Sequence, residues 1–214
     1  MKVAVILFPG SNCEKDVADV LTELGAEAHV IWHRETDLGD FDGVVLPGGF
    51  AHGDALRTGA IARFSPVMTE VTRMAAEGSP VLGICNGFQI LCETGLLPGA
   101  LIENRDLSFI CRFVDVEVVD TETILTSGAT IGQRIRIPLN SYEGSWVDPS
   151  GMGRIAMRYV DDPNGSQDRA AAVANSRGNV VGVMPHPERG SESLLGSEDG
   201  LVLLEGFLRS MAQV

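Results

Sequence analysis

Short, uninterrupted apolar runs constrain the fold of this 214-residue chain more than any other feature. Runs of this kind predict strands that are buried on both faces of a parallel sheet. Because amphipathic segments follow several of these runs, we expect an open, mainly parallel sheet with helices on both faces. The runs cover residues 3–8, 28–32, 43–46, 81–84 and 180–184.

The helices of this α/β pattern are predicted from apolar stripes and from their end signals. We expect the Ser11-x-x-Glu motif to cap the first helix and Gly25 to end it. Ser65 followed by Pro66 predicts the start of a second helix. An apolar face over residues 200–211 predicts the last one.

The pattern changes between about residues 112 and 184. Residues 113–119 alternate between apolar and polar side chains, which is typical of a strand with one exposed face. Strand-like pieces follow at residues 124–126, 134–138 and 155–160. We expect a small antiparallel layer added to the parallel sheet. Since no linker, repeat or low-complexity tract interrupts the chain, residues 1–214 are expected to form one domain.

Charge and cysteine usage exclude several functions. Lys plus Arg number 16 and Asp plus Glu 29, and the net charge of −13 would repel phosphate backbones and anionic lipids. We therefore expect no nucleic-acid or membrane partner. No apolar run approaches the roughly 18 residues of a membrane span, and no signal segment opens the chain. The four cysteines form no C-x-x-C pair and have no metal-type spacing with the histidines, which favours a reduced, cytoplasmic setting without a metal site.

A cysteine between two glycines, Gly83-Ile-Cys85-Asn-Gly87, follows the fourth apolar run. A nucleophile on a sharp strand-to-helix turn needs small residues two positions before and after it, and glycine tolerates the strained backbone. The start of a helix also favours a thiolate, because the positive end of the helix dipole faces it. Taken alone, this pentapeptide fits a buried structural cysteine better than a nucleophile.

A second motif, Met184-Pro-His186-Pro-Glu188, changes that interpretation. Pro187 favours an extended His186, and residues two apart on an extended chain point to the same side. One imidazole nitrogen can then face a thiol while Glu188 holds the other. A lone histidine in a proline-rich loop is usually a surface residue, but with the cysteine turn it predicts a Cys85–His186–Glu188 triad.

The loop Leu46-Pro-Gly48-Gly49-Phe50 also follows a predicted buried strand. Its backbone N–H groups, at Gly49 and Phe50, are predicted to join that of Asn86 in an oxyanion hole. Proline and two glycines after a strand are by themselves only a turn. The prediction depends on the cysteine turn and the His186–Glu188 pair.

Together these motifs resemble class I, triad-type glutamine amidotransferases. More specifically, the chain resembles the family of glutaminase subunits of phosphoribosylformylglycinamidine synthase, and the likeness covers almost the whole chain. It implies a flavodoxin-like class I glutaminase fold and a single type 1 amidotransferase domain. The matching segments are residues 8–13 (Phe-Pro-Gly-Ser-Asn-Cys), 46–50, 53–54, 56–57, 59–66, 83–89 (Gly-Ile-Cys-Asn-Gly-Phe-Gln), 95–100, 163–166 and 184–189 (Met-Pro-His-Pro-Glu-Arg).

The resemblance implies that Cys85 attacks the carboxamide carbon of L-glutamine and that His186 protonates the departing ammonia. It also implies that Gln89 binds the amino-acid end of the substrate. In this family the ammonia passes to a large synthetase that uses ATP and Mg²⁺, assisted by a small third subunit, to make formylglycinamidine ribonucleotide for purine biosynthesis. No cofactor is expected on this chain itself.

One segment departs from the family pattern. Where the family usually has His-Gly-Glu-Gly, this chain has Ser141-Tyr142-Glu143-Gly144. In the family this segment lies near the glutaminase site, so coupling to the synthetase is the property that the change puts in doubt.

Three alternatives stay open on the sequence alone: a stand-alone cysteine hydrolase or chaperone, a glutaminase-like binding module, and the glutaminase of another pathway. The first commonly has histidine directly after the nucleophile, where this chain has Asn86. Cys13 is expected to pack or cap rather than to act in catalysis. For His52 a role in the site stays open, and for Arg57 substrate contact and interface packing are both possible.

Overall fold

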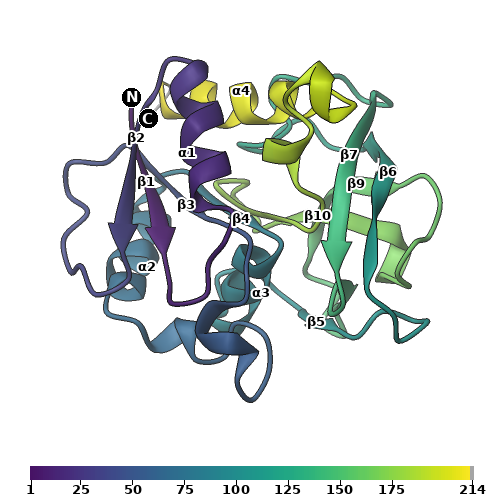
Figure 1. Cartoon of the computed structure of the whole chain (residues 1–214), viewed down its shortest axis with the longest axis horizontal. Helices are drawn as coiled ribbons and strands as arrows, with labels where there is room; N and C mark the ends of the chain where they lie inside the picture. The colour runs from purple at the N-terminus through teal and green to yellow at the C-terminus, as the bar shows by residue number, and fades with distance from the viewer. Residues whose placement is uncertain (213–214) are drawn as a thin grey trace.

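A computed structural model describes residues 1–212 of the chain. One nine-stranded sheet has the order β2-β1-β3-β4-β11-β10-β9-β6-β7, and β5 pairs with β8 in a small second sheet. Figure 1 shows the first strands, β1 and β2, at one side of the molecule and β6 and β7 at the other.

The first half of the sheet is parallel, as predicted. Neighbours β2-β1, β1-β3, β3-β4 and β4-β11 all pair in the parallel sense. The inner strands are buried, which is why they appear in the sequence as uninterrupted apolar runs. The five strands are β1 (Lys2–Leu7), β2 (Glu27–Trp32), β3 (Gly43–Leu46), β4 (Val81–Ile84) and β11 (Val180–Val183).

Helices cover both faces of this parallel half. A Cβ atom on Gly43 of β3 would meet Met211 of α4, whereas the Leu46 carbonyl and side chain lie against Gly87 of α3. Residues three apart on a strand face opposite sides, so α3 and α4 pack on opposite faces. The α-helices are α1 (Glu14–Glu23), α2 (Val67–Glu77), α3 (Asn86–Glu93) and α4 (Gly200–Met211). Within residues 1–212, no helix is long and apolar enough to cross a bilayer.

The predicted capping box at the start of α1 is wrong. The helix begins at Glu14, its N-cap residue is Cys13, and no side chain caps it. Ser11 lies before the helix in a bridge with Gly49, and its hydroxyl accepts a hydrogen bond from the Phe8 N–H at 3.1 Å. The loop after β1 therefore runs along the Gly48-Gly49 loop before the helix starts. Because of this tertiary contact, Ser11 lies in the loop and does not cap the helix.

The second half of the sheet is antiparallel, which confirms the predicted change of pattern. These strands continue the same sheet beyond β11, while the small sheet stands apart from it. The strands are β10 (Ala170–Ala174), β9 (Arg154–Tyr159), β6 (Ile110–Val118) and β7 (Arg134–Ser141), with β5 (Ala100–Ile102) and β8 (Ser145–Val147) in the small sheet.

The strand predicted at residues 124–126 is wrong, because this segment is a turn. The Thr123 hydroxyl accepts the Thr126 N–H at 3.3 Å and lies 2.6 Å from the Thr126 hydroxyl. Threonine hydroxyls that bond the nearby backbone compete in this way with extended structure.

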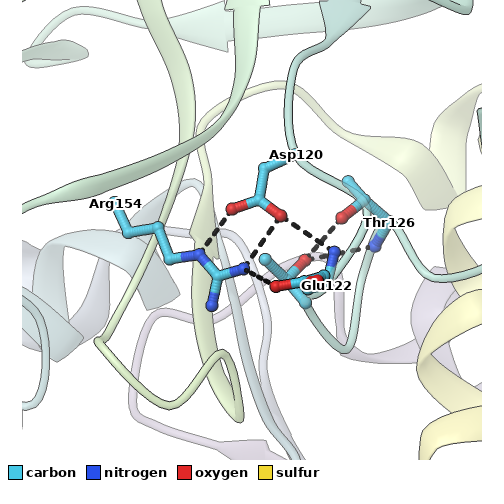
Figure 2. A network of polar contacts seen from close by, with 5 residues as sticks. Asp120, Glu122, Thr126 and Arg154 are labelled. Carbon is cyan, nitrogen blue, oxygen red and sulfur yellow. Dashed lines mark hydrogen bonds and ion pairs between the residues drawn. The ribbon is translucent and has the colours of Figure 1, made fainter. Parts of the chain in front are cut away.

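A polar network stabilises the chain beside this turn, as Figure 2 shows. Arg154 donates to both carboxylate oxygens of Asp120 and reaches Glu122 at 3.4 Å. Burial opposes ionisation of Asp120, yet Arg154 and the Glu122 N–H together lower its pKa. The pair ties the start of β9 to the segment that leaves β6.

Candidate active site

Cys85 lies on a sharp turn between β4 and α3. Its backbone is strained, with φ of 50° and ψ of −104°, and its side chain is buried. A Cβ atom on Gly87 would lie 1.9 Å from the Leu46 carbonyl oxygen, and one on Gly83 would lie 2.7 Å from the Gly87 backbone. Only glycine fits at these two positions, so the flanking glycines allow the turn to pack against β3.

His186 and Glu188 form a buried hydrogen-bonded pair after β11. His186 has an extended backbone, and its Nδ1 lies 2.7 Å from the Glu188 carboxylate. The backbone N–H of His186 donates to the Pro138 carbonyl of β7, and this bond holds the His186 backbone in place. Within residues 1–212, His186 Nε2 is buried and has no hydrogen-bond partner, so it is free to exchange a proton with a thiol or a substrate.

Electrostatics favour the protonated form of this histidine. Burial opposes its charge, but Glu188 and the thiols of Cys85 and Cys13 raise the pKa of His186 well above its ordinary value. A histidine that holds a proton beside Cys85 can deliver that proton to a leaving group.

A cavity of about 310 Å³ opens beside these side chains. This volume is at the lower end of the range for small-molecule pockets. The cavity lies where β1, β3, β4 and β11 end, the usual place for ligands in parallel sheets. Among the residues that line it are Cys85, His186, Gly49, Phe50 and Gln89.

The predicted oxyanion donors differ in availability. Within residues 1–212, the N–H groups of Gly49 and of Asn86, in the first turn of α3, have no backbone or side-chain acceptor. The Phe50 N–H donates to the Gly10 carbonyl at 2.8 Å and is therefore not available in this conformation. Gly49 and Asn86 are thus the two free donors that the loop and the helix present.

Gln89 is largely committed to contacts within the chain. Its Nε2 donates to the Glu143 carbonyl at 2.6 Å, and its Oε1 accepts from Asn86 Nδ2 at 2.9 Å. The side chain is buried and also lines the cavity. Gln89 therefore positions the Glu143 backbone as well as any ligand that it contacts.

The place of Cys13 beside His186 was not predicted from the sequence. Its Sγ lies 4.0 Å from His186 Nδ1, and burial raises the pKa of this thiol. The position of Cys13 shortly after the first parallel strand was the available signal. Cys13, His186 and Glu188 also place ligand atoms within 4.8 Å of one another, as a metal site requires. The Nδ1 atom in that set already bonds Glu188, so the cluster fits a proton-holding pair better than a metal.

The two residues whose roles the sequence left open lie outside the cavity lining. Arg57 forms a two-bond ion pair with Glu93, at 2.6 and 2.7 Å. The His52 ring packs edge-on against His33, with 5.3 Å between the ring centres. Asp54 belongs to a segment that matches the family, but no role in the site was predicted for it; it does line the cavity.

Comparison with known proteins defines the class of this protein. Residues 1–198 match the CobB/CobQ-like glutamine amidotransferase domain. The chain is 48% identical to phosphoribosylformylglycinamidine synthase subunit PurQ of Rubrobacter xylanophilus, over 97% of this chain and 98% of that one. It is also 48% identical to subunit PurQ of Trichormus variabilis, over 99% of this chain and 98% of that one.

A solved structure agrees with these relatives. A chain in the structure of PurLQS from Thermotoga maritima superposes with a TM-score of 0.94 at 41% identity, over 97% of each chain. The chain therefore belongs to the glutamine amidotransferases and, within them, to the family of PurQ subunits of phosphoribosylformylglycinamidine synthase.

Proposed function

We propose that this chain is the glutaminase subunit of a phosphoribosylformylglycinamidine synthase and that Cys85, His186 and Glu188 are its catalytic triad. The observation that carries the proposal is the buried His186–Glu188 pair, whose free Nε2 shares a cavity with a cysteine on a strained turn. This arrangement supplies a nucleophile, a proton carrier and an orienting carboxylate, the three parts that covalent acyl transfer needs.

The first half-reaction releases ammonia. The Cys85 thiol gives its proton to His186, its sulfur bonds to the carboxamide carbon of L-glutamine, and the resulting oxyanion is held by the N–H groups of Gly49 and Asn86. The carbon–nitrogen bond then breaks as His186 delivers its proton to the leaving nitrogen, which leaves a thioester. One oxyanion donor typically contributes about 3–4 kcal/mol to such a step.

The second half-reaction restores the enzyme. His186 takes a proton from water, the hydroxide attacks the thioester carbon, and the carbon–sulfur bond breaks to give glutamate. Glu188 holds Nδ1 throughout, so that Nε2 is the nitrogen that exchanges protons. Gln89 borders the substrate and positions the wall around Glu143.

The partners of the chain follow from its family. We propose that ammonia passes to a large synthetase subunit, which binds ATP and Mg²⁺, and that a small third subunit completes the assembly. The name PurLQS of the Thermotoga maritima structure and the synthase-subunit names of the relatives support this assignment. The product would be formylglycinamidine ribonucleotide, in the cytoplasmic pathway of purine biosynthesis.

We also propose that residues 1–214 act as a single domain. Support comes from the nine-stranded sheet, which joins strands from Lys2 to Val183, and from one continuous apolar core. The antiparallel half contributes the wall formed by Asn140 to Glu143 to the same cavity.

Glutamate release from L-glutamine tests the proposed function. We would assay the chain alone and with the synthetase and its small third subunit, and compare Cys85→Ala with Cys92→Ala as a matched control outside the cavity. We expect activity that depends on the partners and falls at least about 10⁴-fold in Cys85→Ala only. Binding of glutamine without hydrolysis in the complete assembly would instead assign the chain to the glutaminase-like binding modules.

A further inference from the structure

The loop that carries the Gly49 donor is anchored to the residues just before α1. The Gly48 carbonyl accepts the N–H groups of Asn12 and Cys13, at 3.2 and 3.3 Å. In a trans peptide the carbonyl and the following N–H point in opposite directions, so these two bonds also fix the direction of the Gly49 N–H. Gly49 has φ of 149°, and a Cβ atom on it would lie 2.6 Å from the Ser11 Cα. The peptide before Gly49 therefore has little freedom to turn.

The Asn86 side chain is a second anchor for this loop. Asn86 is 1% exposed, and its Oδ1 accepts the Ala51 N–H at 3.0 Å. Because a backbone N–H can only donate, the amide atom that faces Ala51 is the oxygen. The amide nitrogen donates to Gln89 Oε1 at 2.9 Å, about one turn further along α3. The side chain is thus held at both ends, and it joins the loop after β3 to the first turn of α3.

The backbone donors after Gly49 are used within the chain. The N–H groups of residues 50–52 are all bonded: two donate to the carbonyls of Gly10 and Pro9, and the one between them donates to Asn86. Within residues 1–212, the Gly49 N–H has no acceptor. Polar backbone groups in a folded chain are nearly all paired, so a single free donor in a well-bonded loop is available to a ligand. That donor belongs to the wall of the cavity, which Gly49 lines.

Strained backbone follows this second anchor. His52, Asp54 and Leu56 have φ of 55°, 52° and 72°, left-handed values that cost free energy at residues other than glycine. Such backbone persists only where neighbouring contacts hold it. The Asn86 amide supplies two of these contacts, since its nitrogen also reaches the Asp54 carboxylate at 3.4 Å. The bond to Asn86 lies along the chain between the strained segment and Gly49, so it keeps that strain from shifting the donor.

The backbone of Asn86 supplies the other free donor, at the start of α3. On the basis of the proposed function, we propose that the Asn86 side chain is a positioning residue, which clamps the Gly49 loop to α3 and so sets the separation of the two oxyanion donors. Such donors act when they lie about 2.7–3.1 Å from the oxyanion. The oxyanion exists in the reaction and not in bound glutamine, so loss of the clamp slows the reaction without weakening substrate binding to the same extent.

Asn86→Ala tests this role, because it keeps the backbone donor and removes the acceptor for Ala51. Asn179→Ala is the matched control. Asn179 is also a buried asparagine that bonds backbone groups, the carbonyls of Ala75 and Ser79 at 2.9 and 3.1 Å, but it does not line the cavity. Both variants are compared with the unchanged chain in the complete assembly with the synthetase and its small third subunit.

Four measurements distinguish a positioning role from general damage to the fold. Glutamate release gives kcat, and calorimetry in a Cys85→Ala background gives the Kd of L-glutamine. Alkylation by iodoacetamide gives the reactivity of the Cys85 thiol: the sulfur bonds to the CH₂ carbon as iodide leaves, the thiol proton passes to the buffer, and no oxyanion forms. Amide hydrogen exchange of the isolated full chain, followed by NMR, reports on the protection of the Ala51 N–H.

We expect Asn86→Ala to lower kcat about 10- to 100-fold, less than the loss of a whole oxyanion donor. The Kd of L-glutamine should change less than about threefold and the alkylation rate less than about twofold, because neither involves the oxyanion. Exchange of the Ala51 N–H should become at least about fivefold faster, as for the loss of one hydrogen bond. Asn179→Ala should leave kcat within about twofold of that of the unchanged chain.

An equal loss in kcat, alkylation and glutamine binding would overturn the proposal, because general damage to the site produces that pattern. A kcat no lower than that of Asn179→Ala, or unchanged exchange at Ala51, would overturn it as well. If the unchanged assembly releases no glutamate while exchange at Ala51 still depends on Asn86, the proposed function fails and the clamp between the loop and α3 stands. If neither is observed, both proposals fail.

Discussion

Two strained segments border the cavity, and they differ in what holds them. The turn at Cys85 is enclosed by buried neighbours, and its flanking glycines touch other backbone. The segment from residue 51 to 56 is open: Gly53 has nothing within 4 Å of a Cβ position, and Leu56 is 88% exposed. A hydrogen bond from the Ala51 N–H to the Asn86 side chain joins the two segments. Dense packing thus fixes Cys85, while the segment from residue 51 to 56 keeps room to adjust.

The largest expected effect concerns the rigid side of this comparison. Glu188→Gln should reduce glutamate release about 10²- to 10⁴-fold, because a neutral amide neither fixes the tautomer nor stabilises the imidazolium of His186. The pKa of His186 should fall, since Glu188 helps to hold it high. Steady-state rates of the assembly and an NMR titration of His186 measure both changes. Unchanged rates would remove Glu188 from the proposed triad.

Gly87→Ala should break the packing that holds the turn at Cys85. Its Cβ would lie 1.9 Å from the Leu46 carbonyl oxygen, so the start of α3 must move away from β3. We expect a loss of about 3 kcal/mol or more in the free energy of unfolding, at the upper end for overpacked sites. Urea denaturation of the purified chain gives the value. A loss below about 1 kcal/mol would contradict the contrast between the two segments.

Gly53→Ala is the matched change in the open segment. With nothing nearby, the only cost is that of a left-handed backbone at φ of 66°, about 1–2 kcal/mol. The same denaturation experiment measures this loss in the free energy of unfolding. Its ratio to the loss in Gly87→Ala shows how far the packing of the two segments differs. Equal losses in the two variants would show that the open segment is packed as tightly as the turn.

Asp54→Asn should make the isolated chain slightly more stable near neutral pH. The pKa of Asp54 is raised from 3.8 to about 6 by burial and Glu143, so the folded state binds the proton more tightly than the unfolded state. Stability is therefore lost as pH rises from about 4 to 6. After allowance for solvent screening we expect a gain of about 1 kcal/mol at pH 7.5 and none at pH 4. A variant that is less stable at pH 7.5 would contradict the view that Asp54 is held without a cationic partner.

The parallel strands and the turn at Cys85 were predictable because their signals are local. A strand buried on both faces is apolar over its whole length, and a turn like that at Cys85 needs glycines on either side whatever lies around it. The His186–Glu188 pair follows from the extended backbone before a proline. The start of α1 and the turn at 124–126 were mispredicted, since contacts with other segments or side-chain bonds decide them.

The sequence by itself determined which segments form the parallel strands and their order along the chain. It also determined the turn at Cys85 and the likeness to a glutaminase family. Only the tertiary structure placed Cys13 beside His186, bound the Phe50 N–H to Gly10, and brought Asp54, Ser141 and Glu143 to one cavity. The physical reason is distance along the chain. Local backbone preferences are determined by neighbouring residues, whereas the charge and free donors of a cavity depend on which distant segments the sheet brings together.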